Sequence, residues 1–129
     1  MPATALSHYN LRSDRRQMEV LKDFYCQFVG LRVGPRPAFD SVGYWLYAGS
    51  EAVLHLSEVK GGEQRQHALR TSFDHVAFQC IDHDAMLQQL QAAAIPYRLA
   101  GVPASEALPA QRQIFFFDPL GNGIELNFS

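Results

Sequence analysis

The sequence has no long apolar run, few cysteines and little net charge, and each of these features argues against a class of protein. No stretch approaches the roughly 20 apolar residues of a membrane-spanning helix, and residues 1–5 lack the apolar core of a signal peptide. The net charge of −2 gives no electrostatic reason to expect a nucleic acid or an acidic membrane as partner. We therefore expect a cytoplasmic protein with a small-molecule partner.

Cysteine usage agrees with this expectation. Only Cys26 and Cys80 are present, the first in an apolar helical pattern and the second at the end of a strand pattern. Buried free thiols are therefore predicted rather than a disulfide or a zinc pair. The 129 residues, 47% hydrophobic and 19% charged, suffice for one domain with a substantial core.

The main positive feature is an internal repeat. Residues 45–56 align without a gap with residues 115–126, which places His55 opposite Glu125. Residues 7–11 align with residues 74–78, which places His8 opposite His75. A repeat that carries a ligand-type side chain at both equivalent positions of both copies predicts a shared site on a pseudo-twofold axis.

The apolar periodicity predicts the same order of elements in each copy: strand, helix, strand, strand, strand. Ser13 is the expected N-cap of the first helix and Gly30 its end, and Asp82 is the expected cap of the second helix. The expected strands are 6–12, 31–33, 42–47, 51–56, 73–80, 97–99, 113–117 and 123–128, the expected helices run to about Val29 and Ala94, and residues 101–110 are expected to form a loop. The prediction is thus an α+β fold of two tandem βαβββ modules, at about 5–59 and 72–129, joined by a linker at about 60–71.

Three motifs resemble those of the vicinal-oxygen-chelate superfamily, which contains glyoxalase I, extradiol dioxygenases, epimerases, fosfomycin-resistance enzymes and bleomycin-resistance proteins. They are His8-Tyr9-Asn10-Leu11-Arg12, Asp74-His75-Val76-Ala77-Phe78 and residues 118–126, Asp-Pro-Leu-Gly-Asn-Gly-Ile-Glu-Leu. In that superfamily each module forms a half-barrel, and two modules enclose a metal ion. The resemblance implies that His8, His75 and Glu125 are the ligands of one divalent metal ion.

The donor types favour the same conclusion. Two neutral imidazoles and one carboxylate form a facial triad with open positions for substrate oxygens, a set that suits Fe²⁺, Mn²⁺, Zn²⁺ or Ni²⁺ better than Ca²⁺. We favour Fe²⁺ or Mn²⁺, with Zn²⁺ and Ni²⁺ as alternatives. Many two-module relatives build the site across two chains, so the resemblance also implies a homodimer.

The fourth repeat position, His55, bears on the reaction. Glyoxalase-like relatives usually carry Glu there, whereas a histidine resembles the acid–base residue of the extradiol dioxygenases. We therefore expect a metalloenzyme that acts on a small substrate with vicinal oxygens, with His55 and Glu125 as catalytic residues and dioxygenase-like chemistry slightly ahead of a glyoxalase I-like lyase, isomerase or epimerase. The alternative of another class is a non-catalytic, ligand-sequestering protein.

Several further side chains are candidates for substrate contact. Arg12 follows His8 on the same strand face and could bind a carboxylate, while Tyr44 and Phe115 are expected in the pocket. The other aromatic side chains of the two hairpins are predicted to lie mainly in the core. His67 and His83 are expected to face solvent.

Overall fold

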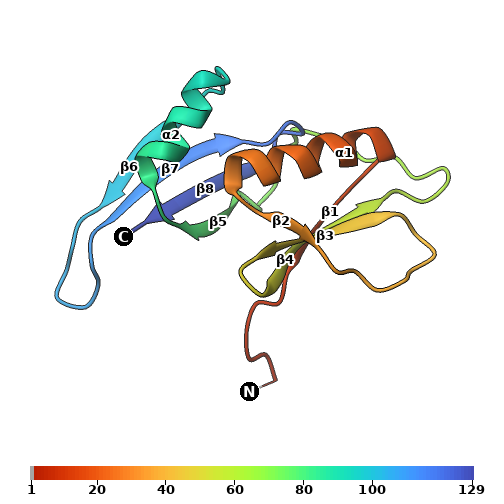
Figure 1. The fold of residues 1–129 in the computed structure, drawn as a ribbon, viewed down its shortest axis with the longest axis horizontal. Helices are drawn as coiled ribbons and strands as arrows, with labels where there is room; N and C mark the ends of the chain where they lie inside the picture. The colour runs from red at the N-terminus through yellow and green to blue at the C-terminus, as the bar shows by residue number, and fades with distance from the viewer. Residues whose placement is uncertain (1) are drawn as a thin grey trace. The chain divides into compact units, whose positions relative to one another are not determined.

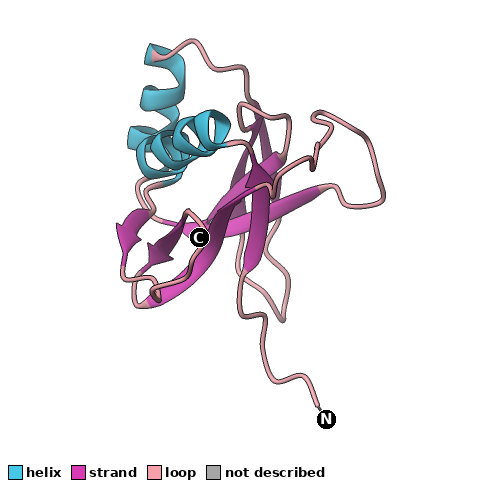
Figure 2. Cartoon of the chain, turned by 90° about the vertical axis from the view of Figure 1, so that its right-hand side faces the viewer, coloured by secondary structure: helices cyan, strands magenta, loops and turns pink. Residues whose placement is uncertain are grey.

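The computed structural model describes residues 2–129, which form two compact units divided between Gln66 and His67 (Figure 1). Each unit contains a four-stranded mixed sheet and its own helical segment, and Figure 2 separates the helices from the strands by colour. The prediction of an α+β fold of two tandem βαβββ modules is confirmed. The division between the units lies inside the segment expected to link the modules.

In the first unit, strand β1 runs parallel to β4, and β4, β3 and β2 follow one another as antiparallel neighbours. The sheet order is therefore β1-β4-β3-β2. Its elements are β1 (Tyr9–Ser13), α1 (Arg15–Phe24), a π-helical turn η1 (Tyr25–Val29), β2 (Arg32–Gly34), β3 (Gly43–Ala48) and β4 (Glu51–Glu58).

The second unit repeats this plan with the order β5-β8-β7-β6, in which only β5 and β8 are parallel. Its elements are β5 (His75–Cys80), α2 (His83–Ala92), β6 (Arg98–Val102), β7 (Gln111–Phe117) and β8 (Gly123–Phe128). The expected last strand is reproduced from Gly123 to Phe128. Strand β6 extends to Val102, so the expected loop starts two residues later than predicted.

The first helix begins one residue later than its predicted cap. Ser13 is the last residue of β1, where its backbone pairs with Glu58 and its carbonyl accepts from Val59 N at 2.8 Å. Asp14 is therefore the first residue free to cap, and its Oδ1 accepts from Gln17 N at 2.8 Å. Ser13 is therefore part of the sheet, and Asp14 is the N-cap of the helix.

The apolar face of this helix packs on the sheet. Met18 and Leu21 are fully buried, and α1 contacts β1, β3 and β4. The chain then widens into the π-helical turn, which buries Tyr25 and Phe28 and ends at Gly30 with φ = 86°. Glycine adopts that left-handed conformation without a steric penalty, so the predicted end of the helix is confirmed.

The second helix begins after Asp82, as expected, but Asp82 makes no side-chain cap hydrogen bond, because its backbone lies in the left-handed region with φ = 63°. The helix ends at Ala92 rather than Ala94. Ala94 itself has φ = 55°, outside the helical region, and the last turn tightens as Ala94 N donates to Gln91 O at 3.1 Å.

Two expectations about exposure change in the structure. The side chain of His83 is only 9% exposed, because its ring packs edge-on against Phe128 with centroids 4.9 Å apart, so the prediction that it faces solvent is wrong. Phe117, expected in the core, is 65% exposed, whereas its neighbour Phe116 is buried. Among residues 2–129 no helix is long and apolar enough to cross a membrane.

Candidate functional site

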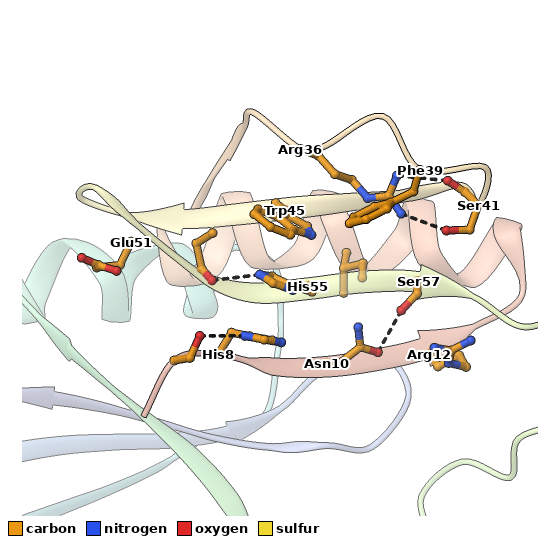
Figure 3. Close-up of a pocket in the computed structure, with 13 residues that line it drawn as sticks. His8, Asn10, Arg12, Arg36, Phe39, Ser41, Trp45, Glu51, His55 and Ser57 are labelled. Atoms are coloured by element: carbon orange, nitrogen blue, oxygen red, sulfur yellow. Dashed lines mark hydrogen bonds between the residues drawn. The ribbon is translucent and has the colours of Figure 1, made fainter. Parts of the chain in front are cut away.

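Three rings stand side by side on one face of the first sheet (Figure 3). His55 of β4 lies opposite Trp45 of β3 and opposite Asn10 of β1. His8 precedes Asn10 by two residues, so the two side chains point to the same face. The His55 ring stacks on Trp45 with centroids 4.1 Å apart and on His8 at 3.7 Å. The sheet register thus brings the two histidines of the first repeat together.

The environment of His55 favours its neutral form. Burial lowers the pKa of His55, with smaller contributions from the neighbouring His8 and from Arg36. Its Nε2 lies 3.1 Å from the carbonyl oxygen of Ala52. Because a carbonyl only accepts, Nε2 carries the proton and Nδ1 keeps its lone pair. His55 is therefore arranged to accept a proton or to donate its lone pair to a cation.

In the second unit, His75 joins two carboxylates. Its Nδ1 lies 2.7 Å from Asp74 Oδ2, and its Nε2 lies 3.1 Å from Glu125 Oε1. The other Glu125 oxygen accepts from Gln113 Nε2 at 3.2 Å. Asp74 therefore fixes His75 with the proton on Nδ1, which turns the Nε2 lone pair of the neutral ring toward Glu125.

This pair fits a divalent metal ion. Glu125 is only 8% exposed, and a buried carboxylate requires a partner of opposite charge or strong hydrogen bonds. In the neutral ring, Nε2 and the Glu125 oxygen are two electron-pair donors facing one another, so a cation between them is favourable. Imidazole nitrogen and carboxylate oxygen are donors that Mn²⁺, Fe²⁺, Ni²⁺ and Zn²⁺ accept.

Glu125 is positioned by a hydrogen-bonded turn. The buried Asp118 accepts from the backbone nitrogens of Leu120 and Asn122 at 2.9 and 3.0 Å and from Asn122 Nδ2 at 2.8 Å. Gly121 has φ = 86°, which allows the chain to reverse there. Strand β8 then begins at Gly123, and the two residues that flank Glu125 along the strand, Ile124 and Leu126, are buried. The third sequence motif therefore forms the turn that leads into β8, the strand that carries Glu125.

The repeat seen in the sequence is also a repeat of register. Asn10 pairs with His55 in the first sheet, and the equivalent residues Ala77 and Glu125 pair in the second. Trp45 opposite His55 corresponds likewise to Phe115 opposite Glu125. Within residues 2–129, no three His, Cys, Asp or Glu side chains lie together as metal ligands. Each unit therefore offers one pair.

The first pair borders a cavity of its unit, and His75 of the second pair borders another cavity. The first cavity, of about 540 Å³, is bordered by His8, His55 and Arg12. The second, of about 450 Å³, is bordered by His75 and Phe115. The His75 ring meets Phe115 edge-on at 5.6 Å.

The predicted site residues thus fall into groups. The structure brings His8 together with His55 and His75 together with Glu125, and it places Arg12 and Phe115 at the cavity of their respective units. Tyr44 does not border the first cavity. Its hydroxyl donates to the carboxylate of Glu19 on α1, and Lys22 Nζ lies 5.4 Å from its ring centroid, so it lies on the helix side of the sheet.

Sequence reasoning did not single out Asp74, Gln113 or Arg36. Asp74 had a usable signal, because a carboxylate directly before a ligand-type histidine is a common partner of its other ring nitrogen. Gln113 shares its strand face with Phe115 by alternation, which is a weaker signal. Arg36 sits between two prolines in an irregular segment, where no periodicity indicates the direction of a side chain.

The family model of the Glyoxalase/Bleomycin resistance protein/Dioxygenase superfamily matches residues 5–126, and the chain belongs to this superfamily. Similar solved structures include a protein from the mobile metagenome of V. Pseudocholerae, with 20% identity, coverage of 99% of this chain and 96% of that chain, and a TM-score of 0.67. The antibiotic-binding protein TnmS3 from Streptomyces shares 22% identity, with coverage of 99% and 98% and a TM-score of 0.64.

A mutant of the fosfomycin-resistance protein FosX from Listeria monocytogenes is also similar, with 16% identity, coverage of 98% and 93%, and a TM-score of 0.65. That structure was solved with Mn(II) and 1S,2S-dihydroxypropylphosphonic acid. No curated protein sequence matches the chain significantly. At these identities the solved structures share the fold with this chain.

Proposed function

We propose that this protein is a divalent-metal-dependent enzyme that acts on a small substrate with vicinal oxygens. The observation that carries the proposal is the buried Glu125 carboxylate facing the Nε2 atom of His75, with Asp74 behind the ring. His8 completes the proposed ligand set. The proposed ligands would come from one chain or from two chains of a homodimer.

The bound metal would act as a Lewis acid that polarises the adjacent oxygens of the substrate. The chain's own residues supply proton transfer. His55, neutral and with Nδ1 free to accept, takes a proton from a substrate hydroxyl in the favoured dioxygenase-like reaction. In the glyoxalase I-like alternative, His55 or Glu125 removes a proton from carbon. Fe²⁺ or Mn²⁺ remains the favoured ion, and the Mn(II) found with FosX supports a divalent metal in this fold.

A non-catalytic binding protein is the second candidate. The wall of stacked rings at Trp45, His55 and His8 is a surface on which a flat ligand could rest without chemistry, and the antibiotic-binding protein TnmS3 shares the fold. The His75→Ala variant separates the two functions. An enzyme loses metal and turnover in this variant, whereas a sequestering protein keeps its affinity for its ligand.

Elemental analysis of protein purified without chelators tests the proposal. We expect near-stoichiometric Fe or Mn in the wild type and its loss in Glu125→Gln, which keeps the shape of the buried side chain. Glu106→Gln, an exposed glutamate of the loop before β7, is the matched control and should keep the metal. Equal metal content in all three proteins, or no metal after reconstitution of the wild type, would contradict the proposal.

A further inference from the structure

One end of the first unit's cavity is positively charged. Arg36 borders the cavity, where its Nη1 donates to Ser41 O at 3.0 Å and its Nη2 to Ser41 Oγ at 3.2 Å. No carboxylate of residues 2–129 forms an ion pair with Arg36, and its buried Nε has no hydrogen-bond acceptor. The two Nη groups therefore meet only the neutral oxygens of Ser41, and no anion of the described chain balances the charge of this guanidinium.

The sheet is shaped to receive this guanidinium. A Cβ atom at Gly43 would lie 2.4 Å from the backbone oxygen of Leu56 and 2.9 Å from Arg36 Nη2, so the absence of a side chain at Gly43 lets the guanidinium lie close to β3. On its other side the guanidinium lies 4.8 Å from the ring centroid of Phe39. Arg36 is therefore held between the sheet and an aromatic ring.

A second cation, Arg12, borders the same end. It is opposite Ser57 on β4, whose hydroxyl donates to Asn10 at 2.9 Å. The hydrogen bond from Arg65 is the main cause of the lowered pKa of Glu63, to which Arg12 adds only a small contribution, and no carboxylate of the described chain lies within ion-pair distance of Arg12. Glu51, the one acidic residue that borders the cavity, lies at the opposite end, beyond His8 and His55 (Figure 3).

Between the two ends stands the aromatic wall. Trp45 and His55 are stacked, and the Phe39 ring is tilted with its centroid 6.4 Å from that of Trp45. Aromatic faces and edges of this kind bind flat apolar groups, while planar guanidinium groups match the geometry of a carboxylate.

We propose that this cavity binds an aromatic carboxylate, with the acid group at Arg36 and Arg12 and the ring against Trp45 and Phe39. The inference rests on the proposed function in one respect, because it takes this ligand to be the substrate class of the enzyme. An aromatic acid bound in this way extends from the arginines toward the histidine pair, where its ring oxygens would react.

The chain contains a reporter for this cavity, because Trp45 is its one tryptophan. Titration of the full-length protein with benzoate, with and without EDTA, should change the Trp45 fluorescence in a saturable way. Arg36→Gln should weaken benzoate binding at least about tenfold, the loss expected for a charge-assisted hydrogen bond. Arg12→Gln should weaken binding as well. Arg16→Gln, with the same change of charge on α1 and away from the cavity, should leave the affinity unchanged.

Two uncharged or non-aromatic probes complete the test. Benzyl alcohol and cyclohexanecarboxylate should each bind at least about tenfold more weakly than benzoate, since each lacks one of the two recognised groups. Equal binding of either probe, or unchanged affinity in both folded arginine variants, overturns the inference. Circular dichroism verifies folding. Because the titration in EDTA does not depend on metal, a failure of the proposed metal site and a failure of this inference are distinguishable.

Discussion

At the scale of the residue, the pairing of Asp74 with His75 is the interaction that most directly prepares a ligand. We expect Asp74→Ala to weaken metal binding by about tenfold, the lower end of the roughly 10–100-fold range for such partners, because Asp74 is exposed to solvent. Competition with a chromogenic chelator measures the change. Asp84→Ala removes the similar contact to His83 and should leave metal affinity unaltered. Equal losses in the two variants would argue against a positioning role for Asp74.

Another residue-scale prediction concerns thiol reactivity. Burial raises the pKa of the Cys80 thiol to about 11, and burial also raises the pKa of Cys26. Since the thiolate is the reactive form, Cys80 in a Cys26→Ser background should be alkylated slowly at pH 8. Its rate should rise by about tenfold per pH unit toward pH 10, because the thiolate fraction grows tenfold per unit below the pKa. Mass spectrometry after iodoacetamide treatment measures this. A rate that levels off near pH 9 would refute the burial argument.

At the scale of the element, the junction of β5 and β8 sets the geometry of the second pair. A Cβ atom at Gly123 would lie 2.4 Å from Asp74 O and 3.1 Å from the Cβ of His75. We expect Gly123→Ala to lower the free energy of unfolding by about 1–3 kcal/mol, the usual cost of overpacking. Gly61→Ala meets nothing within 4 Å and should change it by less than about 0.5 kcal/mol. Urea denaturation compares the two, and equal stabilities would show that the backbone adjusts freely.

The elements also show what the sequence could and could not predict. Alternation and periodicity identified the order of strands and helices, because apolar faces must meet a core, and Gly30 and Gly123 marked true boundaries. The cap at Ser13 was misplaced because the parallel pairing with β4, a long-range contact, takes that residue into the sheet. Long-range packing also explains the error at His83, whose cover is supplied by Phe128 of the last strand.

The candidate site, too, was predicted where a local pattern marked its residues and missed where none did. The repeat identified the pairs His8–His55 and His75–Glu125, because equivalent positions in two copies of one fold lie on equivalent strands. It did not identify Arg36, since an irregular segment between prolines has no periodicity from which a direction can be inferred. Tyr44 was expected in the pocket, yet its side chain lies on the helix side of the sheet. It directly precedes Trp45 on β3, and alternation along the strand points the two side chains to opposite faces.

At the scale of the whole molecule, the proposed ligand set raises the question of whether one chain or two complete it. Heterodimers of a His8→Ala chain and a His75→Ala chain, purified through two tags, answer it by their metal content. If the site combines units of different chains, one of the two sites in each heterodimer receives only unaltered residues and binds about one metal ion per dimer. If the site lies within one chain, every site contains a substitution and the heterodimer binds as little metal as either parent. The homodimers of each variant are the controls.

The matching registers of β1 with β4 and of β5 with β8 have a consequence for inheritance. Each pair of ligand-type side chains depends on the strand pairing within its own half. Each half of the gene therefore encodes one complete pair. A recombinant that joins the first half of this chain to the second half of a relative with the same register would keep both pairs in place. New combinations of ligands could thus arise by exchange of halves, without rebuilding either sheet.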